Sequence, residues 1–162
     1  ALVKGKNLKF KPDDWERDML RRGKRENTLL SCQNLIKMTW KDYRKQYSAS
    51  KGGVDMQCGS LVRYLMSSRV RKNKQTKDIL LTYLRHLNDV AQEIEKKRDA
   101  ERDKDTKEAE TEEEEEAQRK KEREQNEKQS RYIVDETFKR TFGTWSEKDW
   151  EKFERSWAKA SL

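Results

Sequence analysis

The sequence predicts an all-α protein: a small helical bundle, then a long charged helical or disordered tract, then a C-terminal aromatic helical hairpin. In the first part of the chain, apolar side chains recur at steps of three and four, the period of helices that bury one face. Between residues 95 and 130 the apolar side chains are three alanines, so that stretch cannot form a core. Apolar side chains return after residue 131, again at helical spacing. We therefore expect a basic flexible arm (1–11), a basic helical bundle (12–97), a charged low-complexity tract (98–130) and a docking segment (131–162).

Composition limits the class of protein. Charged residues make up 43% of the chain, well above the roughly 25% of ordinary globular domains. Residues 1–94 hold 21 Lys and Arg against 10 Asp and Glu, so the basic excess lies on the segment that folds. Such a surface attracts phosphate polymers or anionic proteins. No apolar leader or membrane-length apolar run is seen, and we expect an intracellular, reduced compartment, nuclear rather than cytoplasmic, with no membrane partner.

The bundle should contain four helices. The first, over residues 12–22, begins at a proline and should be released by Gly23, and the second should span 27–47. A third is expected over 58–71, and a fourth over 76–97 with Thr76 as its N-cap. Each is expected to bury one apolar face. For the first helix that face is Trp15, Met19 and Leu20; for the fourth it is Leu80, Leu84, Leu87, Ala91 and Ile94, widened by Ile79, Tyr83 and Val90.

The charged tract allows two states, a solvated helix supported by ion pairs one turn apart or a disordered polyampholyte. Each such pair stabilises a helix by only about 0.2 to 0.5 kcal/mol, so the balance is close. We expect the fourth helix to continue to about Lys107, then a frayed middle, then helix again from about Ala117.

The C-terminal segment carries the clearest local signal. Gly143 should end one helix, and Ser146 should cap the next over residues 147–160, with Trp145 and Trp150 as a hydrophobic staple. An aromatic face of this density must dock, either on the N-terminal bundle or on another chain. The partner-docking side chains would be Trp145, Trp150, Phe153 and Trp157.

The stretch TWSEKDWEKFERSW, residues 144–157, resembles the opening helix of Myb or SANT-like DNA-binding repeats, which begin with a tryptophan and an acidic first turn. Those repeats need two further helices after it, and the resemblance covers less than a tenth of the sequence. It therefore assigns no functional residue.

Catalysis is not favoured, because the chain has one histidine and neither a glycine-rich phosphate loop nor a serine elbow. Cys32, Cys58 and His86 are too few and too scattered for a zinc site, and we expect no metal, cofactor or small-molecule substrate. The two thiols should pack as small hydrophobic side chains.

The function we expect is non-catalytic binding of DNA or RNA, within a larger assembly, through contacts to the phosphate backbone. Solvation of turns by basic side chains explains the junction between the third and fourth helices equally well, and for Trp40, Tyr43 and Tyr47 we favour a core role over base stacking. The alternative function is a scaffold whose aromatic helices dock on partner proteins without touching nucleic acid. The expected phosphate-binding residues are Lys4, Lys6, Lys9 and Lys11 in the arm, and Arg63, Arg69, Arg71, Lys72, Lys74 and Lys77 at the junction.

Overall fold

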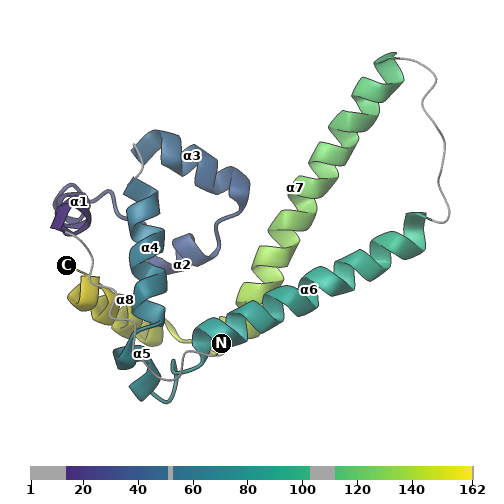
Figure 1. Ribbon diagram of the computed structural model, residues 1–162. Helices are drawn as coiled ribbons and strands as arrows, with labels where there is room; N and C mark the ends of the chain where they lie inside the picture. The colour runs from purple at the N-terminus through teal and green to yellow at the C-terminus, as the bar shows by residue number, and fades with distance from the viewer. Residues whose placement is uncertain (1–13, 51–52, 103–111, 162) are drawn as a thin grey trace, which may run out of the picture.

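The structure is a computed structural model that describes residues 14–50, 53–102 and 112–161. Every regular element in those ranges is an α-helix, which confirms the expected all-α class. One group of helices forms a bundle, and α6 and α7 project from it as a pair that diverges toward its tip (Figure 1). The helices are α1 (Asp14–Arg25), α2 (Cys32–Ile36), α3 (Trp40–Ser50), α4 (Gly53–Leu65), α5 (Ser68–Lys72), α6 (Ile79–Arg102), α7 (Glu112–Phe142) and α8 (Glu147–Ser161).

Helix α4 is the centre of the bundle, because α1, α2, α3, α5 and α8 all pack against it. Val54, Leu61 and Tyr64 of α4 are buried among the side chains of its neighbours, and the ring of Tyr64 meets the ring of Phe153 edge-on at 5.3 Å. The C-terminal segment therefore shares one core with the N-terminal helices. The buried apolar members of that core are Cys32, Leu35, Val54, Leu61, Tyr64, Val70, Ile79, Phe142, Trp150, Phe153 and Trp157.

Helix α1 differs from the expected first helix in its end and in its buried face. It continues through Gly23, whose missing Cβ makes room for Leu29; an added Cβ there would lie 2.5 Å from a Leu29 methyl carbon. The chain turns only at Asn27, which has a left-handed φ of 53°. Leu20 is buried as expected, but Trp15 is 61% exposed. The predicted face was therefore wrong for Trp15.

The helix predicted over 27–47 is two helices, α2 and α3. Ser31 caps α2 by accepting a hydrogen bond from the Asn34 amide at 3.2 Å. Thr39 caps α3 in a reciprocal pair with Asp42: the Asp42 carboxylate accepts the Thr39 amide at 2.9 Å, and the Thr39 hydroxyl accepts the Asp42 amide at 3.3 Å. These caps satisfy backbone amides that have no partner in the first turn of a helix. A second helix can therefore begin within one continuous apolar pattern.

The predicted third helix is likewise divided, into α4 and α5. α4 begins at Gly53, earlier than expected, and ends at Leu65, and Ser67 precedes the short helix α5. Thr76 is not the N-cap of the following helix, because α6 begins at Ile79 and the Thr76 hydroxyl instead donates to the carbonyl of Val70 at 3.2 Å.

Helices α6 and α7 run antiparallel, since His86 Nδ1 lies 3.0 Å from Thr141 Oγ1 while Arg98 bonds to Asn126 at 2.9 Å. The buried line along α6 is rotated from the expected stripe: Val90 is fully buried, but Leu84 is 49% exposed. α7 is helical from Glu112, before the expected start at Ala117. The continuation of α6 to Lys107 lies outside the described residues.

The junction between α7 and α8 follows the expectation closely. α7 ends at Phe142, and Gly143 follows it where an added Cβ would lie 2.5 Å from the Lys139 carbonyl oxygen. Ser146 and Asp149 form a reciprocal cap, with the Asp149 amide donating to the Ser146 hydroxyl at 3.3 Å. The rings of Trp145 and Trp150 meet at 4.7 Å, which confirms the hydrophobic staple.

Candidate nucleic-acid interface

Five cations are exposed on and just after α5, and we call this surface the α5 basic turn. Its members are Arg69, Arg71, Lys72, Lys74 and Lys77. Residues 69–77 contain no acidic side chain, and the acid that follows, Asp78, lies 3.8 Å from the Lys77 amine with both side chains well exposed. Such an exposed pair is weak because water screens it. Within the described ranges, neither Lys72 nor Lys74 has a carboxylate within 4.0 Å.

Buried side chains and hydrogen bonds fix the backbone of the α5 basic turn. Val70 is buried at 1% exposure, and Thr76 is buried at 6% with its hydroxyl bonded to the Val70 carbonyl. The Asn73 side chain accepts a hydrogen bond from the Gln75 amide at 2.9 Å, and the Asn73 amide donates to the Val70 carbonyl at 3.1 Å. Two buried side chains and these bonds fix the backbone, so the five cations project from an ordered segment.

One member of the predicted basic junction has another role. The guanidinium of Arg63 pairs with the carboxylate of Glu16, which is buried, and so joins α4 to α1. A cation already neutralised inside the fold has little charge left for a phosphate. Arg71 also makes a local bond, donating to the Met66 carbonyl at 3.1 Å, but its side chain stays exposed. The lysines of the N-terminal arm, Lys4, Lys6, Lys9 and Lys11, lie outside the described residues.

The four side chains expected to dock on a partner pack inside this chain. Trp150, Phe153 and Trp157 are each less than 8% exposed, and Trp145 is half-buried against them. The indole nitrogen of Trp157 donates to the Ser60 hydroxyl of α4 at 3.0 Å. Of the two docking targets that the sequence allowed, the structure shows the N-terminal bundle of the same chain.

The aromatic residues of α3 have a different environment from the expected core. Trp40 is 69% exposed and Tyr47 is 47% exposed, so the core prediction was wrong for both. Tyr43 is half-buried at the edge of the core, and its hydroxyl bonds to Asp55, which raises the pKa of Tyr43 above its ordinary value. The sequence signal that was missed is the pair of lysines and the arginine interleaved with these rings, which is more typical of a surface than of a core.

The two cysteine thiols are not activated as nucleophiles. Burial raises the pKa of the Cys32 thiol and of the Cys58 thiol. A thiol with a raised pKa holds its proton at neutral pH and is a poor nucleophile. In the described part of the chain, no three His, Cys, Asp or Glu side chains are grouped to hold a metal ion, and no helix is long and apolar enough to cross a bilayer.

No protein-family model, no curated protein and no solved structure matches this chain.

Proposed function

We propose that this protein is a non-catalytic nucleic-acid-binding subunit of a larger assembly, and that the α5 basic turn contacts the phosphate backbone. The observation that carries the proposal is the exposure of five cations within residues 69–77, without an acidic residue among them, on a backbone anchored by Val70 and Thr76. Phosphates are evenly spaced along DNA and RNA, so fixed cations can neutralise several of them and release counterions without reading any base. We place the protein in the nucleus or in another compartment that holds DNA or RNA.

The salt dependence of binding follows from the number of cations. Five phosphate contacts on duplex DNA predict a slope of about −4.5 for log affinity against log salt, which is about a 500-fold loss between 50 and 200 mM. A smaller slope would mean that fewer of the five side chains reach phosphates.

The test is a charge reversal with a matched control. In the first variant Arg69, Arg71, Lys72 and Lys74 become glutamate; in the control, four cations of α7 do, namely Arg119, Lys120, Lys121 and Arg123. Both variants lose eight charges, so each falls from a formal net charge of +8 to about zero. Gel shifts with DNA and RNA at several salt concentrations should show a large loss of affinity for the first variant and a much smaller loss for the control.

Equal affinities for the two variants would show that net charge alone, and not the α5 basic turn, sets binding. Unchanged affinity of the first variant relative to the unmodified protein would reject the site. The scaffold alternative receives less support from the fold, because the aromatic side chains it needs are packed against α4 and a partner would have to displace them.

A further inference from the structure

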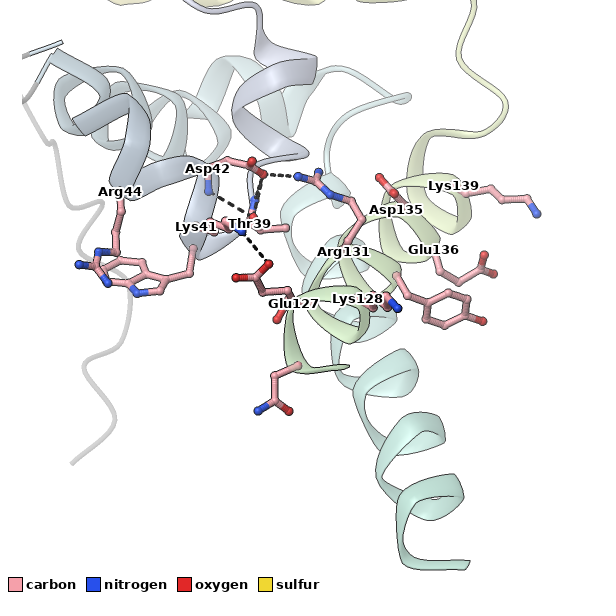
Figure 2. Close-up of a pocket in the computed structure, with 14 residues that line it drawn as sticks. Thr39, Lys41, Asp42, Arg44, Glu127, Lys128, Arg131, Asp135, Glu136 and Lys139 are labelled. Carbon is pink, nitrogen blue, oxygen red and sulfur yellow. Dashed lines mark hydrogen bonds and ion pairs between the residues drawn. The ribbon is translucent and has the colours of Figure 1, made fainter. Parts of the chain in front are cut away.

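A groove of about 950 Å³ lies between α3 and α7, and we call it the α3/α7 groove. Figure 2 shows Lys41 and Asp42 of α3 facing Glu127 and Arg131 of α7, while Arg44 lies to the left of them, farther from α7. Two exposed aromatic side chains line the groove: Trp40 on α3, which is 69% exposed, and Tyr132 on α7, which is 50% exposed.

Trp40 is held in a fixed orientation by its neighbour. Its indole stacks on the ring of Tyr43, with the centroids 5.1 Å apart and the planes inclined by 15°. Tyr43 is itself fixed by its bond to Asp55 on α4. One indole face is therefore covered while most of the side chain is open, so a second ring can stack on the free face without reordering the side chain.

Three of the four acidic side chains that line the groove form ion pairs, whereas three of the five basic ones form none among the described residues. The Lys41 amine lies 2.6 Å from the Glu127 carboxylate, and Arg131 pairs with Asp42. By contrast, no carboxylate lies within 4.0 Å of Arg44, Lys128 or Lys139 in the described part of the chain. In Figure 2, Lys139 extends away from the paired residues.

The pairing extends to a third acid. Glu136 accepts a hydrogen bond from Arg140 at 3.1 Å, which leaves Asp135 as the acidic group of the lining without an ion pair among the described residues. The unpaired side chains of the lining are therefore three cations and one carboxylate, and their net charge is positive.

The residue types that line the groove distinguish between two possible ligands, a partner helix and a nucleic-acid strand. A partner helix would need an aliphatic floor for its apolar face. Of the 14 lining residues, none is Ala, Val, Leu, Ile or Met. Aromatic faces next to free cations, without aliphatic side chains, are the combination that holds a nucleic-acid strand with unpaired bases.

We propose that the α3/α7 groove binds a short stretch of single-stranded nucleic acid. One base stacks on the open face of Trp40 and another reaches Tyr132, while Arg44, Lys128 and Lys139 neutralise the connecting phosphates. A duplex does not fit this site, because its bases are already paired and stacked. The groove is separate from the α5 basic turn and does not require it, so the two proposals can fail independently.

The test compares two exposed tryptophans. Trp40→Ala removes the stacking surface, and Trp15→Ala, on α1 and 61% exposed, is the matched control. Affinity of the full chain is measured by fluorescence anisotropy with labelled oligo(dT) and oligo(rU) of about 12 nucleotides, and with a DNA hairpin duplex. Loss of one stacked base corresponds to a fall of between about 5-fold and about 150-fold in single-strand affinity. We expect that fall in Trp40→Ala, no fall in Trp15→Ala, and little change of duplex affinity in either.

Trp40→Phe separates stacking from folding, because phenylalanine keeps a flat ring and should retain most of the affinity that alanine loses. Far-UV circular dichroism confirms that each variant is folded. If Trp40→Ala binds both single strands as tightly as Trp15→Ala, the groove does not hold nucleic acid. If Trp40→Ala loses single-strand and duplex affinity equally, base stacking is rejected. A loss that persists in the α5 charge-reversal protein supports the groove even where the α5 basic turn has failed.

Discussion

Replacement of Trp157 by alanine tests whether α8 is docked on α4 of its own chain. Trp157 is 6% exposed, and its indole nitrogen donates to the hydroxyl of Ser60, which is 3% exposed. Truncation of a buried tryptophan to alanine costs about 3 to 5 kcal/mol, from lost burial and from the cavity that remains. The variant also leaves the Ser60 hydroxyl buried without its donor, which places the cost toward the upper end of that range.

The free energy of unfolding is measured by urea titration followed with far-UV circular dichroism, since the mutation itself alters tryptophan fluorescence. Small proteins unfold with about 5 to 15 kcal/mol, so Trp157→Ala should remove a third or more of the total. In thermal unfolding the midpoint should fall by about 6 to 20 °C. Trp157→Phe keeps a ring in place and should lose about 1 kcal/mol for the hydrogen bond together with a smaller packing term.

Trp15→Ala is the control, because that side chain is 61% exposed and its loss should change the free energy of unfolding by about 0.5 kcal/mol or less. A Trp157→Ala protein as stable as Trp15→Ala would show that α8 does not pack on α4. The aromatic face of α8 would then be free for another chain, as the scaffold alternative requires.

Three further predictions concern helix ends. Ser146→Ala should lower the free energy of unfolding by about 0.5 to 2 kcal/mol in urea titration, because it removes the N-cap of α8; an unchanged value would mean that the cap does not form. Gly143→Ala should cost more than about 1 kcal/mol in the same assay, since its Cβ would meet the Lys139 carbonyl at 2.5 Å, and equal stability would contradict that close approach. Asp42 has a pKa lowered chiefly by the hydrogen bond from the Thr39 amide. The stabilisation that ionised Asp42 provides is therefore complete above about pH 4 and is lost as the pH falls through the lower pKa that Asp42 has in the folded protein. In urea titrations between pH 7 and 3, Asp42→Asn should remove this part of the pH dependence of the free energy of unfolding.

The parts of the fold that the sequence predicted well are those set by neighbours along the chain. Ser146, Asp149, Trp145 and Trp150 lie within six residues of one another, and a cap and a staple need nothing more distant. Gly143 acts in the same local way at the end of α7. The start, end and buried face of α8 were therefore accessible without any knowledge of the rest of the fold.

The division of the predicted 27–47 helix into two also depends on nearby residues, but on capping residues and not on the spacing of apolar side chains. Apolar residues continue at steps of three and four through Met38, so the period alone cannot distinguish one helix from two. Ser31 is bonded to the amide of Asn34, and Thr39 to the carboxylate of Asp42, so each capping residue lies three residues before its partner. Capping residues therefore deserve equal weight with periodicity in a charge-rich helical sequence.

The buried face of α6 could not be predicted, because it depends on which helix packs along it. Val90 and Leu84 are both apolar and both lie within the predicted face. Val90 is fully buried and Leu84 is half exposed, since α7 runs along one side of α6 and leaves the other open. The sequence determines that α6 has an apolar face wider than one partner can cover, and only the tertiary arrangement selects the part that is buried.

Helices α3 and α8 also show that the burial of an aromatic side chain depends on the tertiary arrangement. Trp40 and Trp150 both lie in the first turn of a capped helix with a nearby aspartate, yet one is 69% exposed and the other 7%. α8 packs on α4, whereas Trp40 of α3 lines a groove opposite the charged helix α7. The end of the charged tract, at residues 126–130, thus supplies part of one wall of the α3/α7 groove. Lys41 and Glu127, which join the two walls, are 86 residues apart in the chain, so a site of this kind appears only once the fold brings its halves together.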